Sequence, residues 1–194
     1  MADCGKRLQE VRDVIAAAHK DCSVLEKLQF YDQWATQYEE LQRCGFQLFH
    51  GLDGSAGMLE VAKKKDLYQE LKQSMLGQGP LPCDSEKYDA VIIVGALSDG
   101  QVPVLVLPEL LRVTKPGGFV CMTTRSNISN LQYKAELEEE LSSLQYKGFW
   151  EQVLVEEVEQ WEKATSEKEI NQESDYIPGV IFIYRKMSAP SIVS

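Results

Sequence analysis

The sequence predicts an α/β fold built on a doubly wound sheet. Two observations predict it. From residue 46 onward, apolar segments of strand length alternate with segments of helical periodicity. The segment YDAVIIVGAL, residues 88–97, is apolar at nearly every position, as expected of a strand that is covered on both faces in a parallel sheet. With 194 residues, 44% of them hydrophobic, the chain is long enough for one well-filled domain.

The N-terminal 42 residues predict helices. Apolar residues from Leu8 to Cys22 recur at spacings of three and four, which places them on one helical face. A second helix is predicted over VLEKLQFYDQWATQYEELQ, residues 24–42. Within it Tyr31, Trp34 and Tyr38 share a face, where they either pack in the core or cover a flat ligand as a lid.

The segment FHGLDGSAGMLEVAKKK, residues 49–65, predicts a strand end, a turn and a helix. Ser55 can cap this helix, which buries Met58 and the nearby Leu59 and Ala62. The three lysines at its end suit a helix C-terminus. The next stretch, DLYQELKQSML, is ambiguous, and a strand near its end is one alternative.

The second half of the chain continues the alternation. PELLRVTKP predicts a short helix with Pro108 in its first turn, and GGFVCMTTR turns on two glycines into a strand. A helix carrying Leu137, Leu141 and Leu144 follows. The last segments, FWEQVLVEEV and GVIFIYRK, predict an antiparallel pair of strands at one edge of the sheet.

The net charge of −10 is concentrated in one region. Residues 136–175 hold thirteen acidic and three basic residues, which equals the net charge of the whole chain. No basic stripe is present, so a nucleic-acid partner is not expected. An acidic stretch of this kind is either a solvated surface or a site for a cationic partner or substrate.

The residues that could bind a metal or act as nucleophiles are scattered. The five cysteines form no CxxC or Cys/His pair, and neither His19 nor His50 lies near a nucleophile motif, so no metal and no catalytic triad are expected. No apolar run reaches the ~20 residues of a membrane span, and the N-terminus has no apolar stretch of signal-peptide type. We expect a cytoplasmic or nuclear monomer with no membrane partner, for which a protein partner is possible.

Four segments in order resemble the class I S-adenosylmethionine-dependent methyltransferases. They are FYDQWATQYEE, GLDGSAGML, YDAVIIVGAL and LPELLRVTKPGGFVCMTTR, and the likeness covers nearly the whole chain. The resemblance implies a Rossmann-like sheet with strand order 3-2-1-4-5-7-6 and S-adenosylmethionine as the cofactor. It implies transfer of a methyl group to a small molecule or a protein.

The resemblance also implies a cofactor site. Asp53 would accept hydrogen bonds from the two ribose hydroxyls, because both carboxylate oxygens are acceptors. Gly54, Ser55 and Met58 would shape the adenine side, with Met58 as a polarizable apolar wall.

At the methionine end of that site, the resemblance implies Gly95 and Ala96, whose backbone carbonyls can accept an ammonium proton. Tyr31, Trp34 and Tyr38 would form the lid. No catalytic side chain is assigned, because methyl transfer requires little beyond alignment of the sulfonium with the nucleophile.

One part of the family pattern is missing. The first strand, its glycine-rich loop and the following helix belong between the lid and the strand that ends at Asp53, but only residues 39–45 separate Tyr38 from Phe46. These three elements need about 25 residues or more. The turn GLDGSAG has GxxGxxG spacing and lacks the tight GxG that allows close backbone approach. We therefore expect a shortened form, as an alternatively spliced isoform would be, that binds the cofactor weakly or not at all.

Three functional alternatives follow. The first is an inactive or regulatory form of a methyltransferase, the second is an active methyltransferase in which GLDGSAG rebuilds the loop, and the third is a different Rossmann-like nucleotide binder. The acidic residues 136–175 would belong to a substrate cap, which allows a cationic methyl acceptor.

The expected fold is a closed-up sheet of six strands in the order 3-2-4-5-7-6. In it the 88–97 strand pairs directly with the strand that ends at Asp53, which avoids an exposed apolar edge. A split sheet is the alternative. The expected organisation is a helical lid at 1–42, a methyltransferase core at 43–187 that forms a single domain with the lid, and a tail at 188–194.

Overall fold

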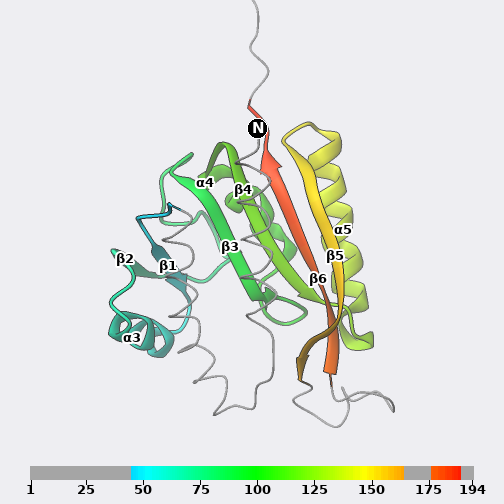
Figure 1. Ribbon diagram of the computed structural model, residues 1–194, viewed down its shortest axis with the longest axis horizontal. Helices are drawn as coiled ribbons and strands as arrows, with labels where there is room; N and C mark the ends of the chain where they lie inside the picture. Colours follow the sequence, from blue (N-terminus) through cyan, green and yellow to red (C-terminus); the bar gives the residue numbers. More distant parts are fainter. Residues whose placement is uncertain (1–44, 164–175, 189–194) are drawn as a thin grey trace, which may run out of the picture. The chain divides into compact units, whose positions relative to one another are not determined.

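The computed structural model describes residues 45–163 and 176–188 (Figure 1). The chain divides into two compact units, Met1–Ser74 and Met75–Ser194. The helices predicted over residues 1–42, with the lid aromatics, lie outside the described residues.

The described part of the first unit is a pair of parallel strands joined by a helix. Its elements in chain order are β1 (His50–Asp53), α3 (Ala56–Lys64) and β2 (Glu70–Gln73). The strands pair from His50 opposite Glu70 to Asp53 opposite Gln73. The ambiguous DLYQELKQSML segment therefore contains a strand.

The helix α3 begins where the sequence predicts. Ser55 is its N-cap, and the Ser55 Oγ accepts a hydrogen bond from the Met58 amide at 3.3 Å. Lys63 and Lys64 lie in its last turn, where positive charge suits the helix dipole. The predicted burial of its apolar residues is only partial, since no residue of this helix is fully buried. The reason is size, because two strands of four residues offer little apolar surface for the helix to cover.

The described part of the second unit is a four-stranded mixed sheet with the order β3-β4-β6-β5 (Figure 1). Its elements in chain order are β3 (Tyr88–Leu97), η1 (Val104–Val106), α4 (Leu107–Val113), β4 (Thr114–Arg125), η2 (Ile128–Asn130), α5 (Leu131–Tyr146), β5 (Trp150–Lys163) and β6 (Tyr176–Lys186). β3 and β4 are parallel, and β6 runs antiparallel to β4 and β5. The predicted order 4-5-7-6 and the antiparallel late strands are confirmed for this half.

The core of the second unit lies between this sheet and the helices α4 and α5, which lie behind the sheet in Figure 1. The helical residues that it buries are Leu107, Leu110, Val113, Tyr133, Leu137, Leu141 and Leu144. Trp150 is 1% exposed, and its indole Nε1 donates to the Leu141 carbonyl at 3.0 Å. Burying one large apolar side chain contributes about 1.5–3 kcal/mol, so this layer is the main source of stability for the unit.

Gly117 and Gly118 lie near the start of β4, where its pairing with β3 shifts register between Thr114 and Phe119. Pro108 lies in the first turn of α4. Gly117 has a φ of +79°, and a Cβ on Gly118 would lie 2.8 Å from the Asp89 carbonyl oxygen. One glycine is therefore needed for its conformation and the other for space.

The described strands form two sheets, β1-β2 in the first unit and β3-β4-β6-β5 in the second. The pairing of β1 with β3 in one closed-up, six-stranded sheet stays a prediction. Full burial of β3 is wrong, because Ile93 and Leu97 are buried whereas Ile92 is 41% exposed.

Candidate functional site

The turn between β1 and α3 brings together the four residues expected at the ribose and adenine. Asp53 ends β1, and its Oδ1 accepts a hydrogen bond from the Ser55 amide at 2.7 Å. The Asp53 carbonyl accepts from the Ser74 amide at 3.0 Å. The Gln73 Nε2 donates to the Gly54 carbonyl at 3.0 Å. The turn is therefore tied to the residues at the end of β2.

The Asp53 carboxylate has capacity for further donors. Its side chain is half-buried, and within residues 45–163 and 176–188 the Ser55 amide is the donor that reaches it. Two carboxylate oxygens offer about four lone-pair positions, whereas a ribose diol presents two hydroxyl donors. Met58 is half-buried in the first turns of the following helix. This turn is chemically suited to the ribose end of a nucleoside.

The residues expected at the methionine end lie at an irregularity in β3. The pairing of β3 with β4 shifts register between Ile93 and Leu97, and Gly95 has a φ of +67°. The Gly95 amide donates to the Thr123 Oγ1 at 3.0 Å. A Cβ on Gly95 would meet no atom within 4 Å, so positive φ is the reason for glycine there.

Hydrogen-bond donors already lie close to the Gly95 and Ala96 carbonyl groups at this irregularity. The Ala96 carbonyl accepts from the Val102 amide at 3.1 Å. The side-chain amide of Gln101 can donate to the Gly95 and Ala96 carbonyls, at 3.2 Å and 3.3 Å. An ammonium group at this place would have to compete with the exposed Gln101.

The sequence-predicted site residues thus fall into three groups. The four turn residues lie together in the first unit, and Gly95 and Ala96 lie together in the second. Tyr31, Trp34 and Tyr38 lie outside the described residues.

Sequence analysis missed a buried polar network that holds the loops after β3 and β4. Asn130 is 3% exposed, and its Oδ1 accepts from the Asp99 amide at 2.9 Å. Its Nδ2 donates to the Thr124 Oγ1 at 3.1 Å and to the Arg125 carbonyl at 2.8 Å. The Thr124 hydroxyl in turn donates to the Leu97 carbonyl at 2.7 Å. The available signal was the polar run TTRSNISN, which follows an apolar strand directly.

A charged pair fixes the segment that precedes β3. The Arg112 guanidinium binds the Glu109 carboxylate through Nε and Nη2, each at 2.9 Å, and Glu109 accepts from the Leu81 amide at 2.7 Å. The hydrogen bond from Arg112 lowers the pKa of Glu109, and the Glu109 carboxylate raises the pKa of Arg112. This pair has a structural role.

Other reactive chemistry is limited in the described part of the chain. No group of three or more His, Cys, Asp or Glu residues there could hold a metal ion. None of the helices in that part is long and apolar enough to cross a membrane. Burial raises the pKa of the Cys121 thiol to about 12, so this cysteine is not a nucleophile at neutral pH.

The chain matches known proteins over most of its length. A family model described as a methyltransferase domain matches residues 34–122. Human methyltransferase-like protein 27 is 43% identical over 190 residues, which cover 76% of this chain and 77% of that protein. Demethylmenaquinone methyltransferase from Bacillus mycoides (strain KBAB4) is 40% identical over 79 residues, which cover 39% of this chain and 33% of that enzyme.

Solved structures share the fold. A SAM-dependent methyltransferase from Methanosarcina mazei superimposes with a TM-score of 0.51 at 15% identity, covering 72% of this chain and 82% of that one. The [4+2]-cyclase SpnF also has a TM-score of 0.51, at 16% identity, and covers 73% of this chain and 68% of its own. Because the second protein is a cyclase, the fold alone does not specify methyl transfer. The sequence likeness carries the assignment: with 43% identity across 77% of a methyltransferase-like protein, this chain belongs to the class I S-adenosylmethionine-dependent methyltransferase family.

Proposed function

We propose that this chain is a methyltransferase-family protein that has lost S-adenosylmethionine binding and acts as an inactive or regulatory form. The observation that carries the proposal is the spacing of seven residues between Tyr38 and Phe46. That spacing is too short for the strand, glycine-rich loop and helix that form the principal cofactor cradle in the family.

The alignment with the human relative supports a missing internal segment. It runs over 190 residues and takes in 76% of this chain, which is about 147 of 194 residues. About 40 aligned positions of the human protein therefore have no counterpart in this chain. A strand, a loop and a helix fit within a segment of that length.

The two separate strand groups also support the proposal. In the family order 3-2-1-4-5-7-6, the first strand lies between the second and the fourth. The described sheets correspond to the two flanking groups, with β1 and β2 as strands two and three and β3-β4-β6-β5 as strands 4-5-7-6. None of the described strands corresponds to the first strand of the family order.

The residues present suit one end of the cofactor only. The Asp53 carboxylate suits the ribose, but no glycine-rich cradle for the methionine end is present in the described ranges, and the Ala96 carbonyl is already bonded to the Val102 amide. Two hydrogen bonds to a charged acceptor contribute about 1.5–3 kcal/mol each. A micromolar dissociation constant needs about 8.2 kcal/mol, so the ribose contact alone falls short.

The first experiment titrates the full chain with S-adenosylmethionine and S-adenosylhomocysteine, followed by amide chemical shifts and thermal melting. A ligand at 100 times its dissociation constant stabilises a binder by about 2.7 kcal/mol. We expect no shift at millimolar ligand. A micromolar dissociation constant that Asp53→Ala abolishes would overturn the proposal.

The second experiment restores the missing segment. A segment of about 40 residues from the human relative, with its first strand, glycine-rich loop and following helix, is inserted between Tyr38 and Phe46. We expect the repaired protein to bind S-adenosylmethionine and to lose affinity on Asp53→Ala. A repaired protein that folds with a cooperative melt and still fails to bind would mean that the missing segment does not explain the loss.

The second candidate function is an active methyltransferase. The observation that favours it is the spare acceptor capacity of the Asp53 carboxylate, held in place by the capped turn. A small molecule or a protein would be the methyl acceptor, and the acidic residues 136–175 would favour a cationic one. A cytoplasmic or nuclear location, a monomeric state and a protein partner remain part of the proposal.

A further inference from the structure

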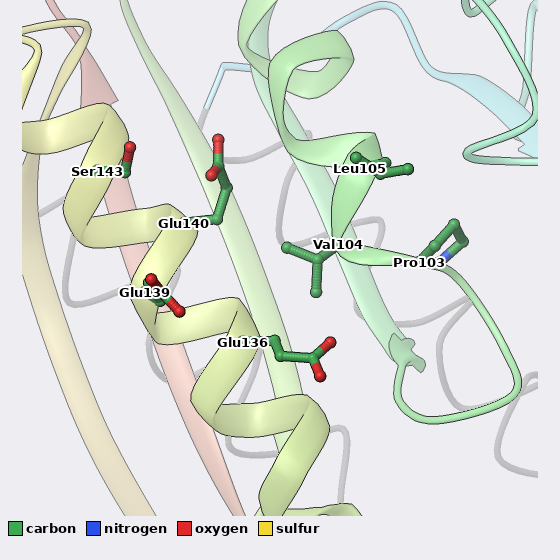
Figure 2. A pocket seen from close by; sticks show the side chains of 7 residues that line it. All are labelled: Pro103, Val104, Leu105, Glu136, Glu139, Glu140 and Ser143. Atoms are coloured by element: carbon green, nitrogen blue, oxygen red, sulfur yellow. The ribbon is translucent and has the colours of Figure 1, made fainter.

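The second unit carries a groove between the η1 segment and helix α5, shown in Figure 2. Its volume is about 450 Å³. One wall is apolar and consists of Pro103, Val104 and Leu105, of which Leu105 is 79% exposed. The facing wall belongs to α5 and presents Glu136, Glu139, Glu140 and Ser143. The groove thus combines an exposed apolar wall with an acidic one.

A hydrogen bond and buried side chains fix the spacing between the two walls of the groove. The Tyr133 hydroxyl, from the first turn of α5, donates to the Val102 carbonyl at 2.6 Å, one residue before the apolar wall begins. Tyr133 is 8% exposed, and both Val106 and Leu137 are fully buried. Because buried side chains and a short hydrogen bond set this spacing, the groove exists without a ligand.

No lysine or arginine among the described residues neutralises the acidic wall of the groove. Glu136, Glu139 and Glu140 lie three and four residues apart on one helical face, where like charges repel. Glu138, by contrast, pairs with Lys134 at 2.8 Å. Within the described ranges, Glu136 accepts a hydrogen bond only from the neutral Gln132 side chain, at 3.2 Å, and no Lys or Arg forms an ion pair with the three groove glutamates. A cationic ligand would relieve this repulsion.

We propose that this groove docks a basic amphipathic helix of a partner protein. The apolar face of that helix would lie on Val104 and Leu105, and its lysine or arginine side chains would pair with the three glutamates of α5. In Figure 2, Glu136 extends from α5 on the side where Val104 lies, and Glu140 projects from the same side of the helix. An open groove along a helix suits a helical segment, whereas small molecules favour sites that enclose most of their surface.

The test uses a defined probe and fluorescence anisotropy in about 150 mM salt, where long-range charge effects are screened beyond about 8 Å. The probe is a fluorescein-labelled 18-residue peptide of leucine and lysine with its leucines on one helical face. We expect saturable binding to the full chain. The triple variant Glu136→Gln, Glu139→Gln and Glu140→Gln should weaken it at least tenfold, and Leu105→Ser should weaken it at least fivefold.

A matched control separates docking from general charge attraction. The triple variant Glu156→Gln, Glu157→Gln and Glu159→Gln removes the same charge from exposed positions on β5 and should leave affinity within twofold. A scrambled peptide of equal composition should bind at least tenfold more weakly. Melting curves check that each variant folds. If a triple variant does not fold, the loss of binding in Leu105→Ser still tests the groove.

Several outcomes would overturn the proposal. They are equal weakening by both triple variants, equal binding of the scrambled peptide, and no binding at 100 µM peptide. Light scattering gives a further outcome: a concentration-dependent dimer that disappears in the groove variants would assign the groove to a second copy of this chain.

Discussion

Replacing Arg112 with Met should destabilise the second unit by about 2–4 kcal/mol. The guanidinium donates to the Leu81 and Cys83 carbonyls at 3.0 and 2.9 Å, and to the Ser85 hydroxyl at 3.1 Å, besides its paired bonds to Glu109. The two partly buried backbone bonds contribute about 1 kcal/mol each. The side chains of the ion pair are 30% and 23% exposed, so solvent screening limits that pair to about 1 kcal/mol. Methionine keeps the apolar stem and loses every donor.

The assay is guanidinium unfolding followed by tryptophan fluorescence in a Trp34→Phe background. The remaining tryptophans, Trp150 and Trp161, are each 1% exposed and lie in the second unit, so the signal reports on that unit. Lys115→Met is the control, since its ion pair with Asp89 is exposed and should contribute under about 0.5 kcal/mol.

The pH dependence tests the same reasoning. Arg112 lowers the pKa of Glu109, so the pair stabilises the folded state fully above the ordinary carboxyl range and loses this effect as the pH falls through the lowered pKa. The gap in unfolding free energy between wild type and Arg112→Met should therefore narrow in acid. A loss under 1 kcal/mol at pH 7, or a gap that widens in acid, would refute the reasoning.

Three other predictions concern single sites. Ser55→Ala removes the cap of α3 and should cost about 1 kcal/mol, seen as faster amide exchange in that helix, whereas Ser55→Asp should retain protection; equal exchange in both would contradict the capping role. Gly179→Ala would place a Cβ 2.4 Å from the Trp161 Cγ and should lower stability by about 1–3 kcal/mol with a shifted tryptophan spectrum; an unchanged spectrum and melt would count against this packing. Because burial raises the pKa of the Cys121 thiol to about 12, iodoacetamide at pH 8 should label the half-buried Cys83 before Cys121 in the native protein, as read by peptide mass spectrometry. Comparable labelling of both would contradict it.

Local patterns in the sequence predicted the elements of the second unit well. The apolar 88–97 segment, the strand that contains Gly117 and Gly118, and the paired late strands all appear, because each depends on residues close together in the chain. Ser55 and Asp53 were located for the same reason, since capping and turn formation act over two or three residues.

Long-range relations were not predictable in the same way. Arg112 binds a segment 27–31 residues away, and Asn130 reaches Asp99 across 31 residues, and no periodicity signals either contact. The direct pairing of β1 with β3 was expected from the family order and from the need to cover the apolar edge of β3. The two strands belong to different units, so this pairing stays a prediction.

The acidic residues of β5 lie on an outer strand of the sheet, where their charge affects the pairing of further strands. Among the described strands β5 has a neighbour on one side only, and along its 14 residues it carries five glutamates: Glu151, Glu156, Glu157, Glu159 and Glu162. An outer strand can recruit strands from other molecules, and a row of like charges makes that addition unfavourable. Glu156, Glu157 and Glu159 are exposed on this strand, so their charges disfavour the addition of a further strand at this edge and limit aggregation.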